Sequence, residues 1–224
     1  DRSGRVIAVV SPKSFDEIKT LDQLNRTEYI YDAMNRVVTI SQVYFDAKSN
    51  LWLNYVEKAY KYDAAGNLVK ELNALGYESG TGTTVNEKID SGYGIQYTYD
   101  LAKQLLTVLD PVSAQRNLQF TTSYTYDAAG RKTSETNANG AVTNYYYDES
   151  GRVLSITVQK TINDPEQSVK INTYDSLGRL LTVTDGNDNV ITYQYNAFDK
   201  AGKVVYPGDS TIPANTVLDR KSVV

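Results

Sequence analysis

Cysteine and histidine are both absent from this chain of 224 residues. Without cysteine, no disulfide framework can form. Without either residue type, Cys/His zinc sites, Ser-His-Asp triads and Cys-His dyads are excluded within the chain. The chemistry that stays open is limited to carboxylates or a Ser-Lys arrangement. The sequence therefore gives no catalytic, cofactor-binding or metal-binding residue, and we expect a protein that is not an enzyme.

Basic clusters and long apolar runs are also lacking. The net charge is −4, the pI is about 5.0, and no run of Lys and Arg occurs, which argues against a nucleic-acid partner. No apolar stretch approaches the length of a membrane span. Tyrosine supplies most of the aromatic content, with 19 Tyr against 4 Phe and 1 Trp. Because buried Tyr hydroxyls need partners, this composition suits strands with one wet face.

A short motif, Tyr-Asp-x-x-Gly-Arg, recurs along the chain with variations. Its copies begin at Tyr31, Tyr62, Tyr99, Tyr126, Tyr147, Tyr174 and Tyr195, and Asp1 to Arg5 is a copy without its Tyr. The copies at Tyr99 and Tyr195 are degenerate, and Asn196 replaces the Asp of the last. The spacing fits a unit of about 21 residues with insertions, which indicates a repeat array whose units contact their neighbours.

The motif predicts the turn of a β-hairpin. Its Asp side chain can accept hydrogen bonds from the backbone N–H groups that follow. The next two positions suit a type I turn, and the Gly provides a positive φ in a G1 bulge. We therefore expect positive φ at Gly66, Gly130, Gly151 and Gly178. Asn35 suits the same position, whereas Lys103 does not, so the turn after Asp100 should be strained or built differently.

The segments before each motif read as strands with two unlike faces. Tyr also stands two residues before the motif Tyr, at positions 29, 60, 97, 124, 145 and 193. A period of two places each pair on one face. We expect these six rings to form a stripe, and the intervening residues to line the other face: Ile30, Lys61, Thr98, Thr125, Tyr146 and Gln194.

This pattern resembles the YD repeat of the Rhs family, which includes Rhs polymorphic toxins, Tc-toxin shell proteins and teneurin-type YD repeats. The resemblance covers nearly the whole chain and is best from Tyr126 to Tyr195. It implies an all-β fold of tandem antiparallel β-hairpins, an arc of a YD-repeat β-shell or barrel, with roughly 14 to 18 strands at two per unit. We expect the array over residues 1–206, starting inside a repeat, and an irregular tail or the start of a further unit over 207–224.

Insertions interrupt the array near 11–28, 41–59, 73–95 and 111–121. A capping-box sequence at 14–17 permits a short helix within 12–25, the alternative being an irregular crossing segment. The second insertion indicates an extra hairpin, from 42–46 through 51–53, in which packing is favoured over a ligand platform as the role of Trp52. The glycine-rich stretch 76–94 favours a mobile loop.

The recurring Asp residues, several of which stand four before an Arg, allow two interpretations. They could bind cations or act as acids and bases, or each could cap its turn while the Arg pairs with it or with the neighbouring repeat. Turn capping is favoured, because a catalytic residue has no reason to recur in every unit. A plain turn is likewise favoured for 185–189, which lacks key ligands of a calcium loop. The sequon Asn25-Arg26-Thr27 is a match that chance can produce.

The resemblance implies a non-enzymatic structural fragment of an Rhs/YD-repeat shell that encloses a toxin cargo. Its partners would be the rest of its own shell and the enclosed toxin region, in a secreted or cell-surface bacterial protein. The alternative is a cell-surface adhesion or carbohydrate-binding module whose stacked Tyr rings bind sugars, although Tyr residues in sheets more often pair across strands. No cofactor is implied.

Overall fold

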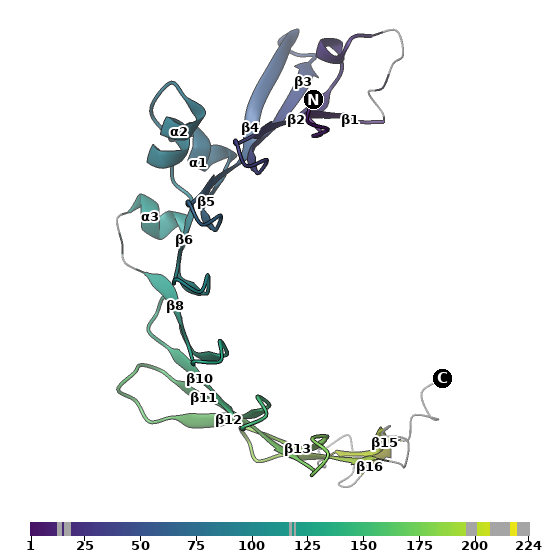
Figure 1. The fold of residues 1–224 in the computed structure, drawn as a ribbon, viewed down its shortest axis with the longest axis vertical. Helices are drawn as coiled ribbons and strands as arrows, with labels where there is room; N and C mark the ends of the chain where they lie inside the picture. The colour runs from purple at the N-terminus through teal and green to yellow at the C-terminus, as the bar shows by residue number, and fades with distance from the viewer. Residues whose placement is uncertain are drawn as a thin grey trace. The chain divides into compact units, whose positions relative to one another are not determined.

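The computed structural model of the chain describes residues 1–12, 15, 19–116, 118 and 120–195, and the backbone of 201–206 and 216–218. These residues group into two compact units, Asp1–Thr121 and Thr122–Val224. They form 16 strands, a number within the expected range. Within each unit the strands follow sequence order, and each described pair is antiparallel (Figure 1).

The first unit contains seven strands and three short helices. The strands are β1 (Ala8–Val10), β2 (Arg26–Tyr31), β3 (Val37–Asp46), β4 (Leu51–Tyr62), β5 (Leu68–Asn73), β6 (Ile95–Tyr99) and β7 (Leu105–Leu109). The helices are α1 (Ala74–Glu78), α2 (Val85–Ser91) and α3 (Pro111–Gln115), and a single 3₁₀ turn spans Leu21–Gln23.

In the second unit, the regular secondary structure of the described residues consists of strands. They are β8 (Thr121–Tyr126), β9 (Lys132–Thr136), β10 (Val142–Tyr147), β11 (Val153–Gln159), β12 (Gln167–Tyr174), β13 (Leu180–Asp185), β14 (Val190–Tyr195), β15 (Ala201–Tyr206) and β16 (Thr216–Leu218). The predicted tail therefore contains β16, while 207–215 and 219–224 lie outside the described residues.

Each motif hairpin carries the bulge that its sequence predicts. The register shifts by one residue next to the motif Tyr, as between Tyr146 and Tyr147 in the β10–β11 pair. The four predicted glycines have positive φ, from 81° to 91°, and Asn35 has φ of 62°. Lys103 has φ of 64°, so the turn after Asp100 keeps the same geometry with a residue that tolerates it poorly.

The expected extra hairpin at 41–59 is not a separate element. Instead, β3 and β4 are lengthened, and their pairing runs from Thr39 to Asp46 with one bulge, between Ile40 and Ser41. The turn falls where it was predicted, with Asp46 accepting a hydrogen bond from the Ser49 hydroxyl at 2.6 Å. The predicted hairpin is thus present as the outer part of the β3–β4 pair, whose strands have 10 and 12 residues.

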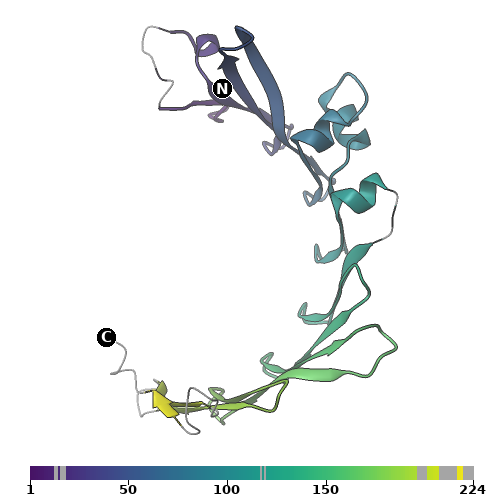
Figure 2. The ribbon, with the colours of Figure 1, turned by 180° about the vertical axis from the view of Figure 1, so that it is seen from behind.

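The prediction of a mobile loop at 76–94 is wrong, because α1 and α2 occupy this stretch. Both helices are capped, α1 by Asn73 and α2 by a capping box between Thr84 and Glu87. They bury Tyr77 and Ile89 against Ala59 and Leu72 of the sheet, the principal apolar cluster among the described residues. Figure 1, and Figure 2 from behind, show both helices beside β4 and β5, on the side away from the motif turns.

The glycines of this stretch permit close packing rather than mobility. A Cβ added at Gly76 would stand 1.9 Å from the carbonyl oxygen of Tyr93, and one at Gly94 would stand 2.3 Å from that of Glu71. Only glycine lets backbone approach backbone this closely. The many glycines of 76–94 therefore reflect close backbone packing and do not indicate a flexible loop.

The other two insertions contain short helical segments. The 3₁₀ turn at Leu21–Gln23 lies within the predicted helical stretch, whereas residues 13–14 and 16–18 lie outside the described residues. At 111–121, α3 begins with Pro111, and the Asp110 side chain accepts hydrogen bonds from two backbone N–H groups of its first turn. Proline at this position fits because its missing N–H has no partner in the first turn anyway.

Candidate functional site

The recurring Asp residues are committed to the motif turns. In the turn at Asp127, one carboxylate oxygen accepts hydrogen bonds from the backbone N–H groups of Ala129 and Arg131, at 2.9 and 3.0 Å. The backbone carbonyl of Asp127 accepts from the N–H of Gly130 at 2.9 Å. The Asp thus fixes the turn by the mechanism that the sequence predicted.

The second carboxylate oxygen pairs with the motif Arg. The Nε–Oδ2 distances are 2.6 to 2.7 Å for Arg5, Arg36, Arg131, Arg152 and Arg179, each with the Asp four residues earlier. Hydrogen bonds from backbone N–H groups, chiefly that of Arg152, lower the pKa of Asp148. The pKa of Asp127 is lowered in the same way, chiefly by the N–H of Arg131. These carboxylates are therefore ionised and occupied.

The same Arg residues also join each hairpin to the next. Each guanidinium lies over the ring of the following motif Tyr, with its carbon 4.5 to 5.0 Å from the ring centroid: Arg5 over Tyr31, Arg36 over Tyr62, Arg131 over Tyr147, Arg152 over Tyr174 and Arg179 over Tyr195. This geometry is that of a cation–π interaction.

The motif Tyr completes the connection through its hydroxyl. It donates to a backbone carbonyl at the start of a preceding hairpin's second strand. The pairs are Tyr31 with Val6, Tyr62 with Val37, Tyr99 with Leu68, Tyr147 with Lys132, Tyr174 with Val153 and Tyr195 with Leu180, at 2.7 to 3.1 Å. Asp, Arg and Tyr thus form one repeated set of contacts, which we call the motif ladder. These contacts stabilise each turn and join neighbouring hairpins.

The ladder is altered at two turns, where Asn67 and Gln104 stand in the Arg position. The Asn67 side-chain amide still donates to Asp63 at 2.8 Å. An amide is neutral, so it provides no cation for the next Tyr ring. The Lys103 ammonium instead donates to the carbonyl of Ala65, at 2.8 Å, in the neighbouring turn.

The sheet of each unit has the predicted unlike faces. In the first unit, strand register places Tyr29, Tyr60 and Tyr97 on one face. In the second unit, it places Tyr124, Tyr145 and Tyr193 on one face. All six side chains are partly buried, and the residue after each is exposed. We call the side that carries these rings the tyrosine face.

The opposite face differs between the units. In the second unit it carries hydroxyl pairs such as Thr173 with Thr182, at 2.7 Å, as the polar character of the intervening residues predicted. In the first unit, Ala59 and Leu72 of that face are covered by α1 and α2. The prediction of a mostly polar face is thus incomplete there, because the helices were not foreseen.

Other sequence candidates have structural surroundings. Asp185 accepts hydrogen bonds from the N–H groups of Asn187 and Asn189, which makes 185–189 a turn like those of the motif. The sequon Asn25 accepts a hydrogen bond from the N–H of Phe45 at 2.9 Å. Trp52 packs on Phe45, with centroids 5.6 Å apart.

The part of the chain that the structure describes offers neither a metal site nor a membrane-spanning helix. No group of three or more His, Cys, Asp or Glu side chains is arranged to hold a metal ion in this part of the chain. Among the same residues, no helix has both the length and the apolar character needed to cross a bilayer.

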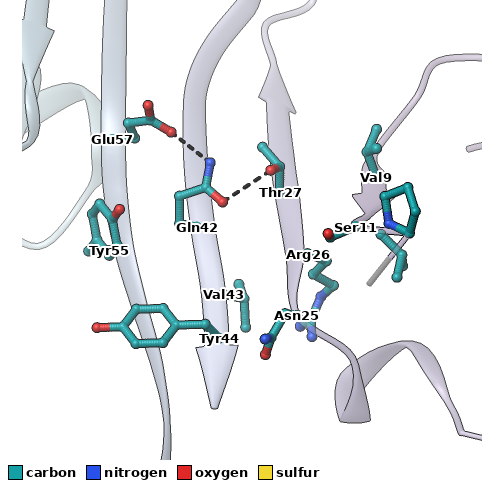
Figure 3. Close-up of a pocket in the computed structure, with 12 residues that line it drawn as sticks. Val9, Ser11, Asn25, Arg26, Thr27, Gln42, Val43, Tyr44, Tyr55 and Glu57 are labelled. Carbon is teal, nitrogen blue, oxygen red and sulfur yellow. Dashed lines mark hydrogen bonds between the residues drawn. The ribbon is translucent and has the colours of Figure 1, made fainter. Parts of the chain in front are cut away.

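A groove of about 500 Å³ on the first unit was missed by the sequence analysis. It crosses β1 to β4 and is lined on the tyrosine face by Thr27, Gln42, Tyr44, Tyr55 and Glu57 (Figure 3). Tyr44, Tyr55 and Glu57 belong to the lengthened β3–β4 hairpin, outside the repeat pattern. Two tyrosines beyond the motif spacing were the signal that could have identified it.

Comparisons with known proteins agree with this architecture of stacked antiparallel hairpins. The family described as RHS Repeat matches residues 118–142, 126–158 and 174–211. No curated protein sequence matches the chain. The crystal structure of TcdB2-TccC3 without its hypervariable C-terminal region superposes with a TM-score of 0.54 at 15% identity, covering 87% of this chain and 11% of that one. The TcdB2-TccC3-Cdc42 structure gives 0.52 at 16% identity, covering 86% and 10%.

The fold therefore defines a β-hairpin repeat protein. The RHS Repeat family matches two stretches of the chain, and this match, together with the fold, confirms the predicted resemblance to Rhs/YD-repeat proteins. The all-β fold of tandem antiparallel hairpins is that of the TcdB2-TccC3 structures. The chain spans about a tenth of the length of the solved chains that it matches.

Proposed function

We propose that this chain is a non-enzymatic segment of the wall of an Rhs/YD-repeat shell, and that the shell encloses a toxin region of the same secreted or cell-surface bacterial protein. The observation that carries the proposal is the motif ladder. One set of contacts recurs from hairpin to hairpin, and it uses the charged and aromatic side chains of the motif to join neighbours. Such a device suits an extended wall rather than a reaction centre.

The two unlike faces of each unit support the same proposal. A wall needs one face toward an interior and another toward solvent. The tyrosine face carries hydroxyl groups and ion pairs, including Lys132 with Glu135 at 2.7 Å, next to its rings. A surface with this mixture would hold an unfolded chain without the strong adhesion expected of a large apolar patch. The similarity to TcdB2-TccC3 in fold is consistent with this arrangement.

Protease protection in the full-length gene product tests the enclosure. We expect the region after Val224 to resist a protease in the native protein and to be digested when it is produced alone. Equal digestion in the two forms would contradict the proposal, as would a gene product that ends at Val224. The repeat region, which forms the wall, serves as the internal control for folding.

A second candidate function is adhesion at a cell surface. The lengthened β3–β4 hairpin favours it, because Phe45 and Trp52 pair there and remain 42% and 40% exposed. If adhesion is the function, replacing both residues with Ser should abolish binding of the full-length protein to target cells and leave any protease protection unchanged. Unchanged binding would exclude this hairpin as the adhesive element.

A further inference from the structure

We propose that the groove across β1 to β4 binds a neutral oligosaccharide. This proposal concerns one site on the first unit and does not depend on the enclosure of a cargo. The groove has a volume of about 500 Å³, which lies within the range of small-ligand sites, roughly 300–1,000 Å³. Three properties of the lining residues indicate the chemical class of the ligand.

The first property is a pair of accessible aromatic rings. Tyr44 and Tyr55 are neighbours across β3 and β4 in an edge-to-face arrangement, with centroids 6.2 Å apart and planes at 80°. They are 37% and 40% exposed, unlike the partly buried motif tyrosines that lie under Arg side chains. An accessible Tyr ring offers an apolar face to the C–H side of a sugar and a hydroxyl to its edge.

The second property is a row of polar side chains held in place beside these rings. The Thr27 hydroxyl donates to the amide oxygen of Gln42 at 3.1 Å, and the amide nitrogen of Gln42 donates to Glu57 at 2.6 Å. Figure 3 shows the three side chains in line across β2, β3 and β4. Since these side chains are already ordered, hydrogen bonds to sugar hydroxyls would cost little further conformational entropy.

The third property is a near balance of charge. Among the described residues that line the groove, the charged ones are Arg26 and Glu57. Arg26 is engaged by Glu28 at 2.6 Å and by the carbonyls of Leu21 and Leu24. A groove without an available cation disfavours phosphate and nucleic acid, whereas a carboxylate beside an amide suits the hydroxyl groups of a neutral sugar.

An NMR titration of the 224-residue chain with lactose, maltose and N,N′-diacetylchitobiose tests the proposal. We expect at least one of them to shift the amide signals of residues 25–27, 42–44 and 55–57. Tyr55→Ala and Glu57→Gln should each weaken that binding about tenfold. The control Tyr93→Ala removes another exposed Tyr of the same unit and should bind as the parent chain does.

Several results would overturn the proposal. One is the absence of shifts with all three sugars. Another is shifts that persist unchanged in both groove variants while their spectra remain those of a folded chain. A third is a preference for a competing ligand: if an unfolded polypeptide such as reduced, carboxymethylated α-lactalbumin shifts these signals and the sugars do not, the groove is a peptide site.

Discussion

The guanidinium carbon of Arg152 lies 4.6 Å from the ring centroid of Tyr174, although the two residues belong to different repeats. The same Arg is bound at 2.6 Å to Asp148 of its own turn. One side chain thus closes a hairpin and holds its neighbour. The ion pair lies within one turn, so this Arg couples the repeats through its contact with Tyr174, beside the hydrogen bond from the Tyr174 hydroxyl to the carbonyl of Val153.

A double-mutant cycle should measure that coupling. Replacing Arg152 with Gln and Tyr174 with Leu, singly and together, should give a coupling energy of about 0.5–1 kcal/mol in urea unfolding, the usual range for a partly exposed cation–π pair. The control cycle combines Arg152→Gln with Tyr193→Leu, in another repeat, and should give none. Equal coupling in the two cycles would remove the ladder as the link between repeats.

The altered turn at Asn67 offers the reverse experiment. Asn67→Arg should place a guanidinium over the ring of Tyr99 and raise the free energy of unfolding by about 0.5–1 kcal/mol. The matched control is Asn67→Gln, which keeps the neutral amide and should not stabilise. If Asn67→Arg lowered the stability, the hydrogen bond from Lys103 to the carbonyl of Ala65 would have taken the place of the motif ladder at this turn.

The turn geometry should make glycine and lysine behave in opposite ways. Gly151 has φ of 82°, and a Cβ there would meet the Arg131 side chain only at ordinary contact distance, 3.5 Å. Gly151→Ala should therefore destabilise through backbone strain alone, by about 1–2 kcal/mol. Lys103→Gly removes the same strain and should offset the loss of its hydrogen bond to Ala65. Thermal unfolding of both variants tests the pair, and a harmless Gly151→Ala would contradict it.

Stability should depend on pH at the acid end. Asp32, Asp127 and Asp148 have pKa values lowered below the ordinary 3.8, chiefly by backbone N–H groups. A group whose folded pKa is depressed stabilises above its unfolded pKa and loses that contribution as pH falls through the folded one. Urea unfolding should thus show constant stability from about pH 5.5 to 8 and a decline below about 4. Asp148→Asn should flatten the decline. A transition near pH 6 would contradict this account, since the chain has no histidine.

The repeated parts of the fold could be predicted from the sequence, and the insertions could not. Positive φ at Gly130 and the alternation of Tyr145 with Tyr146 follow from local rules that each copy states again. The helices α1 and α2 are stabilised by capping residues and by burial of Ile89. Their sequence resembles that of a loop, because the glycines needed for close backbone contacts are also typical of loops. The groove needed Gln42 and Glu57 from two strands to be brought together, and a single sequence gives no register for lengthened strands.

The contact between Arg and the next Tyr was also only partly foreseeable. The spacing of Asp and Arg predicted that the Arg pairs with the Asp of its own turn or with the neighbouring repeat. The structure has both, an ion pair within the turn and a cation–π contact with the next repeat. The choice of the following Tyr ring depends on the distance between neighbouring hairpins. Strand pairing sets that distance, and the motif alone does not.

Single-cysteine labelling of the full-length protein tests the wall most directly. These 224 residues contain no cysteine, so Lys170→Cys and Ile171→Cys, made in a full-length protein whose other cysteines are replaced, each give one thiol, on adjacent exposed residues of β12 that face opposite sides. A polymer-linked maleimide too large to enter a shell should label only one of them in the native full-length protein. It should label both in the isolated 224-residue chain and in urea. Equal labelling of both positions in the native full-length protein would contradict the shell.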